Sequence, residues 1–152
     1  MQKTFIIAEA GVNHNGSMEI AKKLIDEAKK AGADAVKFQT WITEELIDEN
    51  TELAIYQKEN TSGIKSQYEM LKGLELSFDN FRELKMYCDT REIIFMSTPD
   101  EMKSALFLND LQEIFKIGSG DMNNIPLLEL VSSFNKPMIV STGMATLDEV
   151  AK

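Results

Sequence analysis

The sequence predicts an α/β fold in which successive βα units surround a parallel sheet. Short, β-rich apolar runs alternate with longer amphipathic stretches, and this alternation occurs five times along the 152 residues. The length suits one domain, and a composition of 43% hydrophobic and 27% charged residues is ordinary for a folded globular chain. We therefore expect a single domain over residues 1–152 with one hydrophobic core.

The predicted strands and helices follow one another in a regular order. We expect strands at residues 5–11, 35–40, 93–97, 114–117 and 138–141. We expect helices at residues 17–31, 68–73, 78–89, 99–111 and 124–134, with a further helix beginning at Thr146. Ser17 and Ser77 are candidate N-caps, Gly32 lies near the end of the first helix, and Pro99 and Pro126 are placed in first turns.

A long segment separates the second strand from the helix at residues 78–89. It is polar and acidic around residues 44–50 and 57–66, and it contains the short helix at residues 68–73. A connection of this length usually carries function or is disordered. A solvated insertion and a functional loop both remain open.

The charge balance limits the partners of the chain. Its 16 Lys and Arg residues against 25 Asp and Glu residues give a formal charge of −9, which disfavours binding to nucleic acid or to an anionic membrane. No stretch approaches the roughly 20 apolar residues of a membrane helix, and the start does not read as a signal peptide. We expect a cytoplasmic protein whose partners are small molecules or proteins.

The single cysteine and the single histidine both favour structural roles. Cys88 lies at a helical position and is expected to be a small core residue, not a nucleophile. His14, between two asparagines, is expected to be a hydrogen-bonding turn residue. One histidine also excludes a multi-histidine metal site within this chain.

Polar residues gather at the carboxyl ends of the predicted strands, where ligands bind in parallel βα folds. The residues of interest are Glu9, Lys37, Gln39, Lys116, Ser119, Asp121 and Ser141. A lysine inside an apolar strand carries a desolvation cost unless a partner compensates it. Lys37 and Lys116 could clamp one anion, with backbone amides of the neighbouring Gly and Ser residues close by.

Two carboxylates, Glu9 and Asp121, are placed to act on the same ligand. They could serve as general acid or base, or accept hydrogen bonds from hydroxyl groups. The alternative is that each carboxylate pairs with Lys37 or Lys116 in a structural ion network. An anion site explains the five polar strand ends together, and we favour it.

Five blocks carry a resemblance to a known family: IIAEAGVNHNGS, AGADAVKFQT, FMSTP, FKIGSGD and IVSTGMAT. In this order and spacing they resemble the sialic acid synthases, of the N-acetylneuraminate, legionaminate and pseudaminate synthase type. The resemblance implies a (β/α)8 TIM barrel, of which this chain is an N-terminal portion of about five βα units. It also implies a condensation of phosphoenolpyruvate with an N-acetylated amino sugar aldehyde, with C–O cleavage and release of phosphate.

The family's motif positions can be carried over residue by residue. Lys37, Lys116, Ser119 and Ser141 match phosphoenolpyruvate-binding positions, and Glu9 matches a glutamate near the sugar. Asp121 stands where many members have a glutamate implicated in the proton or water step, so the carboxylate is kept but is one methylene shorter. The resemblance also implies sugar contacts at Gln39 and Asn60.

The family implies parts that do not fall within these residues. Its divalent metal, Mn or Mg, is held by histidines on later strands, so we expect no metal to be bound by this chain alone. The last three barrel strands and a small antifreeze-like domain, which caps the site of the partner in a homodimer, also lie beyond Lys152. We expect the 152 residues to be an incomplete portion that is inactive alone.

Three alternatives remain, and the first two differ in class from a synthase. The chain could be a noncatalytic phosphate-binding or assembly module built from a partial barrel. It could be a doubly wound receiver or nucleotide-binding domain, but neither a Gly-rich GxGxxG turn nor an acidic cluster at a strand end is present. Another phosphoenolpyruvate-dependent aldose condensing enzyme on the same barrel is the third, and the blocks NHNGS and GSGD favour the sialic acid branch over it.

Lys116→Ala in the full-length parent is expected to weaken phosphoenolpyruvate binding by about 1.5–3 kcal/mol, because a charge-assisted hydrogen bond is lost. Calorimetric titration of both proteins measures the difference. An unchanged affinity would remove Lys116 from the anion site.

Overall fold

The computed structural model describes residues 3–49, 51, 66–143 and 145–151. The strands are β1 (Ile7–Gly11), β2 (Ala35–Thr40), β3 (Ile94–Pro99), β4 (Phe115–Ile117) and β5 (Met138–Val140). The helices are α1 (Met18–Lys30), α2 (Thr43–Leu46), α4 (Gln67–Leu74), α5 (Phe78–Thr90), α6 (Met102–Asn109), α7 (Ile125–Ser133) and α8 (Leu147–Val150), with a 3-10 turn η1 (Ser119–Asp121). Among these elements no helix is long and apolar enough to cross a membrane.

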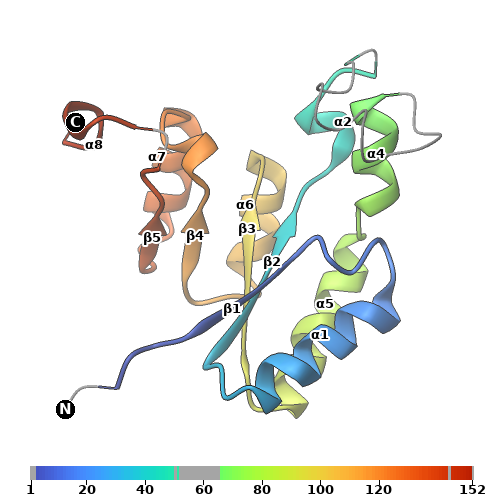
Figure 1. Ribbon diagram of the computed structural model, residues 1–152. Coiled ribbons are helices and arrows are strands. Elements are labelled where there is room, and N and C mark those ends of the chain that lie inside the picture. The colour runs from blue at the N-terminus through green and yellow to red at the C-terminus, as the bar shows by residue number, and fades with distance from the viewer. Residues whose placement is uncertain (1–2, 50, 52–65, 144, 152) are drawn as a thin grey trace.

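All strand pairs are parallel, which confirms the α/β class expected from the sequence. The strands form a three-stranded ladder, β1-β2-β3, and a two-stranded ladder, β4-β5. Figure 1 shows β2, β3, β4 and β5 running side by side, with α2 and α4 beyond the end of β2. The closed (β/α)8 barrel and its division into five units remain predictions.

Successive side chains along a strand point to opposite faces, so apolar residues lie on one face of the ladder and polar residues on the other. Val36 and Phe38 of β2, like Phe95 of β3, belong to the apolar core that packs against the helices. Residues one position away, such as Lys37 and Gln39, point to the opposite face of the same ladder. The strand that anchors the core therefore also presents polar side chains on its other face.

A buried glutamine bridges the place where the two ladders meet. Gln112, which is 2% exposed, lies between α6 and β4. Its Oε1 accepts from the backbone N–H of Ser97 at 2.7 Å, and its Nε2 donates to the carbonyl of Ser97 at 3.0 Å. The side-chain amide thus satisfies the β3 backbone on the side that faces β4, where no ladder hydrogen bonds form.

The cap predictions succeed at Ser17 and Ser77 and fail at Pro99. The Ser17 and Ser77 hydroxyls accept from the N–H groups of Ile20 and Asn80. Pro99 does not start a helix: it is the last residue of β3, where it pairs with Thr40 of β2. The helix α6 starts only at Met102, so the expectation of a helix over residues 99–111 is wrong at its beginning.

The described ends of the long segment are tied together above β2. Glu75, just after α4, accepts from both the backbone N–H and the hydroxyl of Thr43, at 2.9 and 2.5 Å. The indole of Trp41 donates to the same hydroxyl at 3.1 Å. Lys72 of α4 pairs with Glu44 of α2 at 2.8 Å. These contacts fix α2 and α4 as one wall beside the carboxyl end of β2.

His14 and Cys88 are structural, as expected. His14 is fully buried, its Nδ1 accepts from the N–H of Gly16 at 3.1 Å, and burial lowers its pKa. Cys88 is fully buried in α5, and burial raises the pKa of its thiol to about 12. A thiol that holds its proton this strongly is a poor nucleophile.

Gln112→Ala is expected to destabilise the chain by about 2–4 kcal/mol, because two buried backbone groups of Ser97 lose their partner and a cavity is left. Urea unfolding followed by circular dichroism measures the change. Glu113→Ala, at the exposed neighbouring position, is the control and should change stability by less than about 0.5 kcal/mol. Similar losses in the two variants would contradict the bridging role of Gln112.

Candidate functional site

A polar cleft of about 470 Å³ lies at the carboxyl ends of β1 to β4. Its lining comprises Glu9, Lys37, Gln39, Leu46, Thr98, Asp100, Lys116, Gly118, Ser119, Gly120 and Asp121. Six of these residues were singled out from the sequence, and the fold brings them into one cavity because parallel strands end at the same edge of a sheet. Leu46 comes from α2, so the described part of the long segment contributes one wall.

A bulge at the end of β1 shapes the mouth of the cleft. The register of β1 against β2 shifts between Glu9 and Gly11, and Gly11 has a φ of 52°. This left-handed conformation is one that glycine adopts without strain. A Cβ placed on Gly11 would lie 3.5 Å from Glu9 Oε1 and 3.6 Å from Gln39 Oε1, so the backbone here lies directly beside the two polar side chains.

Lys37 is a buried cation with two partners. Its side chain is only 8% exposed, and Nζ lies 2.6 Å from Oε2 of Glu9, which is 59% exposed. Nζ also donates to the Thr98 hydroxyl at 3.2 Å. The structural alternative predicted that Lys37 pairs with a carboxylate, and this ion pair is present. Its Glu9 carboxylate is exposed and lines the cleft.

Lys116 has no carboxylate partner within 4.0 Å among the residues that the structure describes. Its Nζ donates to the backbone carbonyl of Ile117 at 2.7 Å. Burial lowers the pKa of Lys116, the charge of Lys37 lowers it further, and Glu9 acts in the opposite direction. Two ammonium groups thus share one cleft, and the charge of Lys37 disfavours the protonated form of Lys116.

Asp121 is held at the cleft by the start of α7. Its backbone N–H donates to the Gly118 carbonyl at 3.2 Å, closing the η1 turn. Asn124, the N-cap of α7, donates from Nδ2 to Asp121 Oδ1 at 3.3 Å. Ser119 opens the same turn and lines the cleft. The short GSGD motif therefore delivers a hydroxyl and a carboxylate together.

Asp100 is a cleft residue that the sequence prediction missed. Burial raises its pKa to about 7, and the nearby charge of Asp121 adds to the effect. Lys37 and a hydrogen bond from Gln39 act in the opposite direction. The signal was available: Asp100 follows Thr98 by two positions, so an extended chain puts both on the cleft face.

Of the remaining predicted residues, Ser141 is not brought into the cleft and Asn60 is not described by the structure. Ser141 follows β5, and its backbone N–H donates to the Ile117 carbonyl at 3.1 Å, but it is not among the residues that line the cavity. Asn60 lies outside the described residues. Their predicted roles as phosphoenolpyruvate and sugar contacts stay predictions.

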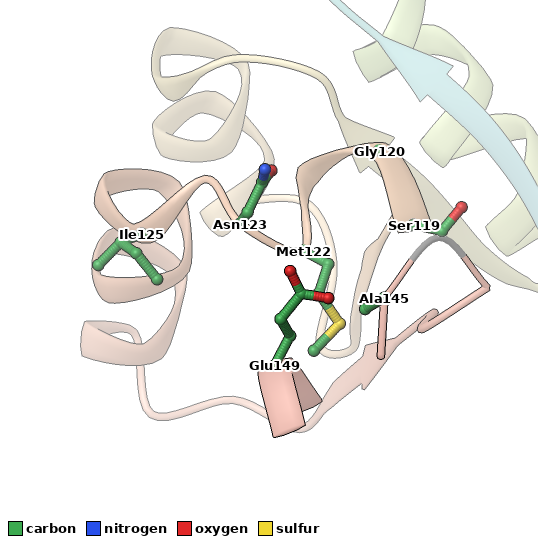
Figure 2. A pocket seen from close by; sticks show the side chains of 7 residues that line it. All are labelled: Ser119, Gly120, Met122, Asn123, Ile125, Ala145 and Glu149. Atoms are coloured by element: carbon green, nitrogen blue, oxygen red, sulfur yellow. The ribbon is translucent and has the colours of Figure 1, made fainter. Parts of the chain in front are cut away.

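A second, more apolar pocket of about 280 Å³ lies on the other side of η1. Figure 2 shows Met122 and Glu149 facing each other in it, while the Ser119 hydroxyl points away from both. The Glu149 carboxylate is already engaged, since it accepts from the backbone N–H and the hydroxyl of Thr146 at 2.7 and 2.9 Å. These hydrogen bonds lower the pKa of Glu149, and they form the capping box at the start of α8.

No metal centre is formed by the described part of the chain. Within it, no three His, Cys, Asp or Glu side chains gather closely enough to hold a metal ion. The single histidine, His14, is buried, and its Nδ1 accepts a backbone hydrogen bond. The described residues therefore do not fit the divalent metal that the family resemblance implies.

Known proteins resemble this chain along its whole length. The sequence profile of the NeuB family matches residues 24–152. The chain is 45% identical over 151 residues to the N,N'-diacetyllegionaminic acid synthase of Campylobacter jejuni, a match that covers 99% of this chain and 45% of that protein. It is 48% identical over 147 residues to the synthase of the same name from Legionella pneumophila, covering 96% and 41%.

A solved structure agrees with these matches. The crystal structure of N-acetylneuraminic acid synthetase from Leptospira borgpetersenii, in complex with citrate, superposes with a TM-score of 0.83 at 35% identity and covers 99% of this chain and 48% of that one. The chain thus spans less than half the length of each of these three relatives.

Asp100→Asn is expected to flatten the pH dependence of stability between about pH 4 and 7. In this range the folded chain keeps a proton on Asp100 that the unfolded chain has released, so the free energy of unfolding of the wild type falls as pH rises. The variant lacks this loss and should be the more stable chain at pH 8 by on the order of 1–3 kcal/mol.

Urea unfolding at pH 4, 6 and 8 measures the effect, with Asp110→Asn, at an exposed position after α6, as the charge-matched control. Parallel pH profiles for wild type and Asp100→Asn would contradict the burial of an ionisable carboxyl at this position.

Proposed function

The chain belongs to the NeuB family, and on that premise we propose that it is the N-terminal part of a nonulosonic acid synthase. The proposed reaction condenses phosphoenolpyruvate with the open-chain aldehyde of an N-acetylated amino sugar and releases inorganic phosphate. Two legionaminic acid synthases are among the similar relatives, which favours a diacetylated sugar as the first one to test.

The observation that supports the proposal most directly is the pair of lysines in one cleft. Lys37 and Lys116 come from β2 and β4, and burial together with the nearby charge of Lys37 lowers the pKa of Lys116. A small ligand with a phosphate and a carboxylate, such as phosphoenolpyruvate, supplies the anionic partner that Lys116 lacks among the described residues. The Ser119 hydroxyl is available as a further donor.

The carboxylates would serve the other half of the reaction. In the proposed sequence C3 of phosphoenolpyruvate forms a carbon–carbon bond to the aldehyde carbon, and the aldehyde oxygen takes up a proton. Water then adds at C2, and cleavage of the C–O bond releases phosphate. We assign Glu9, which is 59% exposed, to accept hydrogen bonds from the sugar, and Asp121, which lines the cleft, to hold the proton of the attacking water.

Turnover is proposed for a longer protein of which these residues are a part. The chain spans less than half of its relatives, and the described residues leave the metal chemistry of the family unsupplied. We expect the isolated 152 residues to hold an anion without completing the reaction. A homodimer and a cytoplasmic location likewise remain proposals for the longer protein.

An assay for phosphate release tests the function. The full-length protein is incubated with phosphoenolpyruvate, a divalent metal and either N-acetylmannosamine or its diacetylated counterpart, and the nonulosonic acid is identified by mass spectrometry. Sugar-dependent release of phosphate is the expected result. Anion binding with no product from either sugar would favour the noncatalytic phosphate-binding module instead.

Glu9→Gln in the full-length protein is expected to lower kcat at least tenfold while changing the Kd for phosphoenolpyruvate less than about threefold. The amide keeps the shape of the side chain but leaves Lys37 without its anionic partner, so any change in affinity should be a gain. Glu113→Gln, exposed and away from the cleft, is the matched control. Equal losses of affinity and turnover would indicate that Glu9 acts only in the fold.

A further inference from the structure

The cleft holds more acidic than basic groups. Three carboxyl groups line it, from Glu9, Asp100 and Asp121, against the two ammonium groups of Lys37 and Lys116. One of these ammonium groups, that of Lys37, already lies 2.6 Å from a carboxylate. With every group ionised, a multiply charged anion would enter a cavity whose own charge is negative, so one carboxyl must be neutral for strong binding.

Asp100 is the carboxyl whose surroundings suit the neutral form. Its backbone N–H donates to the Thr40 carbonyl at 3.0 Å, which fixes it at the end of β3. The Gln39 side chain hydrogen-bonds to its carboxyl group, and Asp121 faces it from the η1 turn. Burial and the Asp121 charge together raise the pKa of Asp100 to about 7, against the opposing effects of Lys37 and Gln39.

The neighbouring acids are engaged in direct contacts with other groups of the chain. Glu9 is paired with Lys37 at 2.6 Å, and Asp121 accepts from Asn124 at 3.3 Å. Glu101, next to Asp100 in sequence, accepts the N–H groups of Lys103 and Ser104 at the start of α6, at 2.5 and 2.9 Å. Its charge therefore serves the helix N-terminus, although it still adds to the negative potential at Asp100.

We propose that Asp100 is an anion-binding residue of this cleft that works as a neutral carboxylic acid, its O–H donating a hydrogen bond to an oxygen of the bound anion. The proton is taken up from solvent as the anion binds, and no covalent bond of the ligand changes. The identity of the anion as phosphoenolpyruvate rests on the proposed function. The proton-linked binding itself applies to any oxyanion that fits between Lys37 and Lys116.

This role makes the cleft selective in a way that two lysines alone would not. A ligand oxygen that accepts a hydrogen bond gains a third donor beside the two ammonium groups, whereas a ligand that offers only N–H or O–H donors does not. Binding becomes weaker above neutral pH, because Asp100 must then recover a proton before the anion can enter.

Proton uptake on binding tests the proposal. The chain is titrated with phosphoenolpyruvate and with sulfate, whose charge does not change between pH 6 and 8, in two buffers of different ionisation enthalpy. At pH 7 the wild type should take up about half a proton per sulfate bound, and its affinity for sulfate should fall about tenfold from pH 6 to pH 8.

Three variants make the assignment specific. Asp100→Asn keeps a hydrogen-bond donor without a titrating group, so it should take up no proton and bind sulfate equally at the two pH values. Asp100→Ala lacks the donor and should bind more weakly than wild type at pH 6. Asp110→Asn removes the same charge from an exposed position outside the cleft and should behave like wild type. Circular dichroism confirms that each variant is folded.

The outcomes that would contradict the proposal distinguish a failure of the Asp100 role from a failure of the anion site itself. Binding by the wild type without proton uptake, or the same uptake in Asp100→Asn, would overturn the role of Asp100 and leave the proposed function standing. If neither sulfate nor phosphoenolpyruvate binds the folded wild type at either pH, both the role of Asp100 and the anion site on which the proposed function depends are overturned.

Discussion

The buried ammonium group of Lys37 is the constraint on which the ladder and the cleft both depend. Burying a charge is costly unless groups around it compensate, and here the compensation comes from both neighbouring strands. Glu9 is the direct register partner of Lys37 on β1, and Thr98 lies two positions beyond its partner on β3. A slip of one residue in β2 would turn Lys37 toward the helices and expose Phe38, so the ion pair and the core enforce the same register.

The chemistry of the cleft follows from that register. Once Lys37 is in place, alternation puts Gln39 beside it, and the parallel ends of β3 and β4 add Asp100 and Lys116. Charges of both signs are then held within one cavity, where burial and the neighbouring charges raise the pKa of Asp100 and lower that of Lys116. Anion binding in a site built in this way is coupled to the protonation of its side chains. A carboxyl group that can take up a proton is therefore compatible with an anion site.

The sequence was informative where local pattern decides the outcome and uninformative where distant contacts do. Lys37 and Lys116 could be identified because a lysine inside an apolar strand is costly. Asp100 was missed because Pro99 resembles a helix start, whereas pairing with β2 extends β3 through it. The role of Gln112 could not be predicted from the sequence, because it depends on a tertiary hydrogen bond with the backbone of Ser97. Ser141 and the GSGD motif look equivalent in sequence, yet only the latter lines the cleft.

Calorimetric titration of phosphoenolpyruvate into the purified 152-residue chain tests most directly whether these strand ends form an anion site. We expect saturable binding that Lys116→Ala and Lys37→Met weaken at least tenfold, while Lys23→Ala, on the exposed face of α1, leaves it unchanged. Binding that is insensitive to both cleft lysines, or no binding by a folded chain, would contradict the account.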